Sequence, residues 1–183
     1  MQIRHKNREI YFREQAECTQ KYVIPYIEQV LCIKPNLRIL EIGCGEGGNL
    51  RPFLDLGCYC VGIDIDVAQV EKAKAFFANH SLNKNLRLIA NDIYKVSPNE
   101  IGNFDLIILR DVIEHLPNQE VFMHQLKCFI TSLSIIKSKC PISLGDTLFI
   151  SFAIKRRFCF LGWFAKNSLA FFTCATSISI PTQ

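Results

Sequence analysis

The sequence predicts an α/β protein whose mostly parallel sheet carries helices on both faces. Short apolar segments alternate along the chain with segments of helical spacing, the order that builds a parallel sheet through crossover helices. The apolar segments show little polar alternation, as expected of strands that are covered on both faces. Polar residues follow the ends of these segments, at the edge where parallel sheets bind ligands.

In chain order, the first element is a helical segment over 8–32, in which charged and apolar residues recur at helical spacing. Pro25 should break or kink it into two helices. Gly57 suits the end of a later helix, and Asp66 suits the start of the next one. The pattern predicts strands over 37–43, 58–66, 85–92 and 104–111, and helices over 47–57, 67–80 and 118–130.

Composition indicates a globular protein, because 49% of the residues are hydrophobic and 21% are charged. The net charge of +4 is too small to indicate a nucleic-acid partner. The nine cysteines form no C-x-x-C pair and the four histidines do not join them at zinc spacing, so we expect no metal. Without a signal-peptide pattern, reduced thiols and a cytoplasmic location are expected.

The stretch "EIGCGEGG", residues 41–48, ends the first predicted strand. Its Gly43, Gly45 and Gly48 spell the G-x-G-x-x-G spacing of a turn that lets backbone approach a nucleotide. Asp64 follows Gly45 by 19 residues and ends the second strand, where a carboxylate accepts ribose hydroxyls. Both features suit NAD and S-adenosylmethionine equally.

Carboxylates near this turn favour a cationic ligand. Glu41 and Glu46 would repel a pyrophosphate and attract an ammonium or sulfonium group. Asp92, after the third strand, can accept the amine of an adenine while Ile93 packs on the ring. These residues disfavour NAD and with it an NAD-dependent oxidoreductase.

Four segments in order, "LRILEIGCGEGGNL", "VGIDID", "NDIY" and "FDLIILRDVIEHL", resemble the class I S-adenosylmethionine-dependent methyltransferases, which have a Rossmann-like fold. The likeness covers residues 8–130 and is closest to the small-molecule type with an "EH" signature after strand four. It implies a cofactor site formed by Glu41, Gly43, Cys44, Gly45, Asp64, Ile65, Asp92, Ile93 and Arg110.

In this resemblance the Gly43–Gly47 turn passes under the methionine moiety, Asp64 binds the ribose, and Asp92 with Ile93 holds the adenine. The backbone of Arg110 lies against the methionine end. His115 is the candidate general base, although together with Glu114 it could instead order its loop. Asp64 could also be a helix cap and Asp92 a turn residue.

The expected function is methyl transfer from S-adenosylmethionine to an unidentified, small-molecule acceptor. The sulfonium is already activated, so the protein mainly aligns the acceptor and excludes water. The alternatives are the NAD-dependent oxidoreductase and a degenerate, non-catalytic domain that binds an adenosyl ligand.

The resemblance ends near residue 130. We expect a methyltransferase domain over 1–152, with a fifth strand at 144–152, and an atypical hydrophobic tail over 153–183. Residues 131–183 carry six basic side chains, one acid and seven of the 14 phenylalanines. Three interpretations stay open: a divergent closing element, a truncated or frame-shifted tail, or membrane contact through 158–180.

Overall fold

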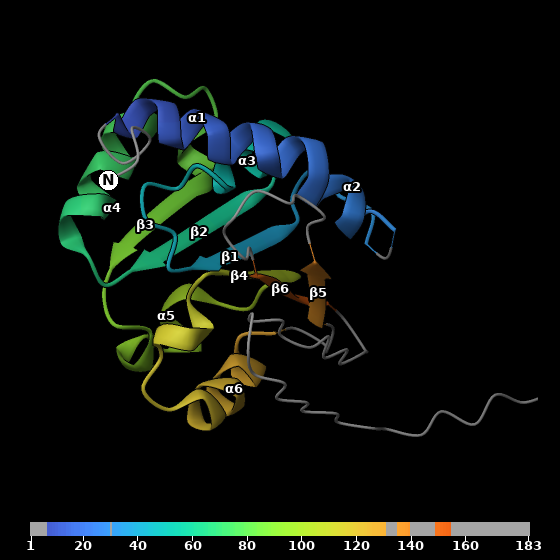
Figure 1. The fold of residues 1–183 in the computed structure, drawn as a ribbon, viewed down its shortest axis with the longest axis vertical. Coiled ribbons are helices and arrows are strands. Elements are labelled where there is room, and N and C mark those ends of the chain that lie inside the picture. Colours follow the sequence, from blue (N-terminus) through green and yellow to red (C-terminus); the bar gives the residue numbers. More distant parts are fainter. Residues whose placement is uncertain (1–6, 30, 131–134, 140–148, 155–183) are drawn as a thin grey trace, which may run out of the picture.

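The computed structural model describes residues 7–29, 31–130, 135–139 and 149–154. These residues form one six-stranded sheet with the strand order β3-β2-β1-β4-β6-β5. Helices cover both of its faces, which confirms the predicted α/β fold (Figure 1).

Four parallel strands make up the part of the sheet that carries the predicted motifs. They are β1 (Arg38–Ile42), β2 (Tyr59–Asp64), β3 (Leu86–Ala90) and β4 (Leu106–Arg110). Because β2 and β4 flank β1 on opposite sides, the strand order reverses beside β1. Ligands of such sheets bind beyond the carboxyl ends of the strands at this reversal.

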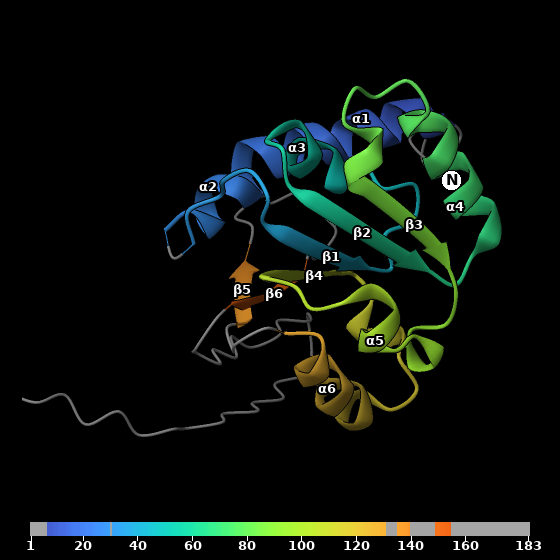
Figure 2. The same cartoon turned by 180° about the vertical axis from the view of Figure 1, so that it is seen from behind.

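The first half of the chain supplies the helices of one face and the second half those of the other (Figures 1 and 2). The first face carries α1 (Arg8–Cys18), the π-helical turn η2 (Thr19–Val23), α2 (Ile24–Ile27), α3 (Leu50–Asp55) and α4 (Val67–Phe77). The opposite face carries α5 (Pro98–Ile101) and α6 (Gln119–Cys128). Short 3-10 turns are η3 (Asn83–Asn85), η4 (Ile93–Lys95) and η5 (Ile113–His115).

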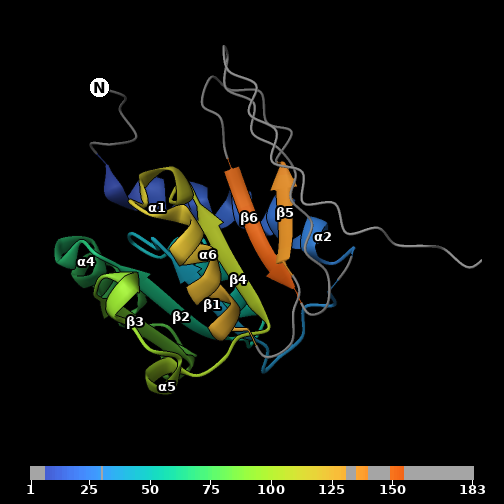
Figure 3. The ribbon, with the colours of Figure 1, turned by 90° about the horizontal axis from the view of Figure 1, so that it is seen from below.

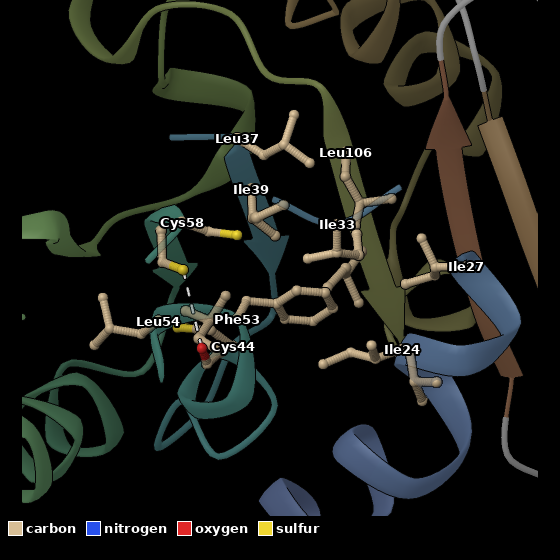
Figure 4. Packing of buried hydrophobic residues seen from close by; sticks show 14 of the residues in the cluster. Ile24, Ile27, Ile33, Leu37, Ile39, Cys44, Phe53, Leu54, Cys58 and Leu106 are labelled. Carbon is tan, nitrogen blue, oxygen red and sulfur yellow. Dashed lines mark hydrogen bonds between the residues drawn. The ribbon is translucent and has the colours of Figure 1, made fainter. Parts of the chain in front are cut away.

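Two hydrophobic cores lie on the two faces of the sheet, and β1 contributes alternate residues to each. Ile39 packs in the core under α1–α4, and Leu40 packs in the core under α5 and α6. Figure 4 shows Phe53 of α3 among Ile24 and Ile33 in the first core. Glu41, the next residue of β1, is also completely buried.

The local helix signals act as predicted. Asp66 caps α4 by accepting hydrogen bonds from the amides of Ala68 and Gln69. Gly57 adopts a φ of +82° just after α3, and its amide donates to the carbonyl of Leu54.

The predicted division of the N-terminal helical segment near Pro25 takes the form of a π-helical turn between two α-helices. Thr19–Val23 forms the π-helical turn between α1 and α2, and Pro25 is in the first turn of α2. The wider π turn accommodates a ring that would clash with the carbonyl four residues earlier in an α-helix.

The sheet continues beyond β4, with a geometry that the sequence did not predict. Strand β6 (Phe149–Ile154) overlaps the expected fifth strand but runs antiparallel to β4. Strand β5 (Ile135–Lys139), for which the sequence predicted no strand, pairs antiparallel with β6 (Figure 3).

Strand β6 extends two residues past the predicted domain boundary at 152. The rest of the predicted tail, including the candidate membrane segment 158–180, lies outside the described residues. Among those described, no helix combines the length and apolar character needed to cross a bilayer.

Candidate functional site

The glycine turn after β1 is held by hydrogen bonds from its own amides. Those of Gly43 and Cys44 donate to the carbonyl of Ile63 in β2, over 2.7 and 3.1 Å. The amide of Gly47 donates to the carbonyl of Cys44 over 2.8 Å. Gly43 has a φ of +70°, and a Cβ there would overlap Val112 after β4. The close approach of the two strand ends thus requires glycine.

Asp64, at the end of β2, closes the turn from the other side. Its Oδ2 accepts the amide of Gly45 over 2.7 Å, and its Oδ1 accepts the amide of Asp66 over 2.9 Å. Asp66 caps α4 itself, so Asp64 is no helix cap. Its carboxylate fixes the glycine turn while remaining at the edge of the cavity described next.

A cavity of about 250 Å³ opens over the turn, at the reversal in strand order. Of the predicted site residues, Gly43, Cys44, Gly45, Asp64 and Arg110 line it. The remaining lining residues are Arg8, Tyr11, Gln15, Glu46, Asn49, Gln69, Asp111 and Val112.

Beneath the turn, Glu41 belongs to a buried polar network. Asn49 donates to Glu41 Oε1 over 2.7 Å and accepts from Arg110 over 2.6 Å and from the Thr19 hydroxyl over 3.0 Å. Burial raises the pKa of Glu41 from 4.5 to about 8, although the Asn49 hydrogen bond and the charge of Arg110 lower it. Glu41 is therefore mainly protonated at neutral pH, a state that the sequence did not predict.

Glu46 lies inside the turn and is 2% exposed. Its Oε1 accepts a hydrogen bond from Arg8 Nε of α1 over 2.5 Å. The ion pair joins the N-terminal helix to the glycine turn, 38 residues away in sequence. It supplies the opposite charge that a buried carboxylate requires.

Asp111, directly after β4, has a φ of +52°. This left-handed conformation is uncommon outside glycine, although aspartate tolerates it better than most residues. Because Asp111 and Arg110 both line the cavity, the strained residue is part of the site.

Besides Glu41, which is buried beneath the turn, four predicted site residues lie outside the cavity lining. Ile65 is 74% exposed, and Ile93 is buried in the core under α5 and α6. Asp92 caps η4 by accepting the amide of Tyr94 over 3.0 Å. His115 is exposed at the end of η5.

The lining residues that sequence reasoning missed come mostly from α1 and from helix starts. Arg8, Tyr11 and Gln15 lie three and four positions apart, so they share one face of α1. That polar spacing was the available signal, but it did not reveal which face meets the turn. Asn49 carried no signal of its own, because its role depends on partners 8 and 61 residues away.

Comparison with known proteins decides the family. Residues 12–130, well over half of the chain, match a family described as "Methyltransferase domain". The chain belongs to this family. The matched residues run from α1 to the end of α6 and include the glycine turn, Asp64 and Arg110.

Individual relatives of this methyltransferase domain are distant. The Ubiquinone biosynthesis O-methyltransferase of Bartonella tribocorum is 29% identical over 112 residues, covering 55% of this chain and 44% of that protein. A SAM-dependent methyltransferase from Aquifex aeolicus shares the fold with a TM-score of 0.58 and 14% identity, over 75% of this chain and 92% of the other. The structure of coclaurine N-methyltransferase, bound to N-methylheliamine and SAH, gives a TM-score of 0.52 and 20% identity. The match covers 62% of this chain and 33% of that chain.

The two solved structures show a shared fold. The chain spans less than half the length of the curated relative from Bartonella.

Proposed function

We propose that this chain is an S-adenosylmethionine-dependent methyltransferase with a small-molecule acceptor. The main support for the proposal is the pattern of hydrogen bonds and charges around the glycine turn. The amides of Gly43, Cys44, Gly45 and Gly47 all donate within the protein, and the carboxylates of Asp64 and Glu46 lie beside them. Such a turn suits a close, cationic ligand better than a phosphate.

The same observation weighs against NAD. A pyrophosphate is bound by amides that point at it with no other acceptor. Here Asp64 already takes the amide of Gly45, the residue at the middle of the fingerprint. Asp64 also lines the cavity with a carboxylate that would repel a phosphate, whereas Arg8 balances the charge of Glu46.

The proposed cofactor site follows the ends of three neighbouring strands. The methionine moiety lies over the Gly43–Gly47 turn and against Arg110, and the ribose hydroxyls meet Asp64. The adenine extends toward Asp92, because Asp64 pairs with Ala90 and its carbonyl accepts the amide of Asn91. Ile65 and the backbone of Ile93 complete this end, the Ile93 side chain being buried elsewhere.

The bound cofactor supplies an activated methyl group, and the chain's residues orient and enclose it. His115 remains our candidate for a general base. Its exposed position on η5 would require an acceptor that reaches across η5 from the cavity.

A small-molecule acceptor is supported by relatives named for ubiquinone biosynthesis and for coclaurine. We expect no nucleic-acid partner and place the protein in the cytoplasm.

Methyl transfer tests the proposal. The full chain is incubated with S-adenosylmethionine and a panel of phenols, amines and extracted metabolites, and formation of S-adenosylhomocysteine is measured. Product that depends on one class of acceptor supports the enzyme. Binding of the cofactor without product from any acceptor would support the degenerate, non-catalytic domain instead.

A further inference from the structure

Side chains from four parts of the chain meet in one buried hydrogen-bonded network beneath the cavity. Asn49, the residue before α3, lies at its centre and is 4% exposed. Its amide nitrogen donates to Glu41 of β1 over 2.7 Å. Its Oδ1 accepts from Arg110 over 2.6 Å and from the Thr19 hydroxyl over 3.0 Å. An amide oxygen has two lone pairs, so these two donors occupy both of them.

Arg110, the last residue of β4, brings this network to the cavity, which it lines. Its side chain is 15% exposed, and its polar partners among the described residues are Asn49 and, with Nε 4.0 Å from Oδ2, Asp111. A guanidinium has five N–H donors on a long side chain with many rotamers. The short, buried bond to Asn49 therefore determines where this guanidinium lies.

Thr19 brings the N-terminal helical segment into the same network. It opens the π-helical turn Thr19–Val23, is 1% exposed and lies outside the cavity lining. A threonine hydroxyl within a helix often donates to a carbonyl one turn earlier, but here it donates to Asn49, 30 residues away in sequence. Turns of the π type are frequent at functional sites. The segment thus reaches Arg110 through a single oxygen atom, Oδ1 of Asn49.

We infer that Asn49 and Thr19 are positioning residues for Arg110, so that the geometry of the cavity depends on the docking of the N-terminal helical segment. Without the Thr19 hydroxyl, Oδ1 of Asn49 loses one of its two donors, and the amide that holds the guanidinium is less firmly fixed. The inference rests on the proposed function, because S-adenosylhomocysteine is the ligand that reports on the cavity.

Calorimetric titration of the full chain with S-adenosylhomocysteine tests the inference. Arg110→Met should weaken binding about tenfold, as expected for the loss of a charged donor from the cavity. Thr19→Val keeps the shape of the side chain and removes the hydroxyl, and it should weaken binding about fivefold. Thr19→Ser keeps the hydroxyl and should bind within about twofold of the unsubstituted chain. Thr19 does not line the cavity, so a loss on Thr19→Val reports on positioning.

A double-variant cycle shows whether Thr19 acts through Arg110. Thr19→Val combined with Arg110→Met should bind no more weakly than Arg110→Met alone, because the group to be positioned is already absent. Asn49→Asp retains an acceptor for Thr19 and Arg110 and loses the donor to Glu41, whereas Asn49→Leu loses both. Asn49→Asp should therefore bind at least about fivefold more tightly than Asn49→Leu.

Gln125→Met is the matched control. The half-buried amide of Gln125, on α6, donates to the carbonyls of Ile93 and Val96, and none of the three residues lines the cavity. Thermal unfolding of all variants measures the cost to the fold separately. Gln125→Met should lower the unfolding temperature and leave the affinity unchanged.

The outcomes separate the two levels of the account. Equal losses on Thr19→Val with and without Arg110→Met, or a Thr19→Ser protein as weak as Thr19→Val, would overturn the positioning role while the proposed function stands. Full affinity in Thr19→Val or in Arg110→Met would do the same. Failure of the unsubstituted chain to bind S-adenosylhomocysteine would overturn the proposed function and the positioning role together.

Discussion

Asp64 serves the site through both of its carboxylate oxygens, one on the glycine turn and one on the entry to α4. Asp64→Ala should weaken S-adenosylhomocysteine by ~2 kcal/mol or more, because the bond to the ribose and the anchor of the turn are both lost. Titration of the folded variant measures this loss. Asp66→Ala is the matched control and should cost the fold about 1 kcal/mol with little change in affinity. An unchanged affinity for Asp64→Ala would refute the ribose assignment.

Glu41 makes the stability of the fold depend on pH. Its pKa rises from 4.5 to about 8 on folding, so between these values the folded state keeps a proton that the unfolded state releases. Its stabilising contribution is complete below pH 4.5 and is lost as pH rises through about 8.

The difference in unfolding free energy between the natural chain and Glu41→Gln, measured at pH 5, 7 and 9, isolates this effect. We predict that the natural chain loses stability relative to the variant as pH rises, by on the order of a few kcal/mol. Parallel pH profiles for the two proteins would show that Glu41 is ionised when folded.

Among the elements, the turn between β1 and α3 is the most tightly constrained. Gly43→Ala should destabilise the fold by more than ~1–2 kcal/mol, the cost of the left-handed conformation, because the methyl group also meets Val112. It should also abolish binding of S-adenosylhomocysteine.

Gly102→Ala provides the control for Gly43→Ala, since its φ of +79° also imposes a backbone cost on alanine, at a position outside the cavity lining. Thermal unfolding and titration of both variants separate the two effects. A Gly43→Ala protein that binds normally would contradict the close approach of the turn.

Elements that depend on local signals were predictable from the sequence. The four parallel strands are apolar runs that end at polar residues or glycine, and the caps at Asp66 and Gly57 are local. Strand β5 was missed because its existence depends on pairing with β6, which no local pattern in 135–139 reports. The type of helix around Pro25 was missed because π-helical turns have no simple pattern.

The residues of the candidate site also divide into those that a local motif predicts and those that it does not. Gly43, Gly45 and Asp64 were identified because their motif has fixed spacing. Arg8 and Asn49 were missed because each acts through a partner in another element. Burial decides the protonation of Glu41, and no local pattern reports it.

At the scale of the whole molecule, the described residues that line the cavity run from Arg8 to Val112. A chain ending at Ile154 keeps β6 and should bind S-adenosylhomocysteine within about twofold of the full chain, less than 0.5 kcal/mol. Titration of the two chains in parallel checks this. Loss of binding on removal of residues 155–183 would make that segment part of the site.

The central claim is that the cavity over the glycine turn binds an adenosyl ligand with a cationic end and does not bind a dinucleotide. Calorimetric titration of the full chain with S-adenosylhomocysteine and with NAD, side by side, tests it most directly. We predict saturable binding of S-adenosylhomocysteine with one site per chain, and no binding of NAD at the same concentrations. Tighter binding of NAD would contradict the account.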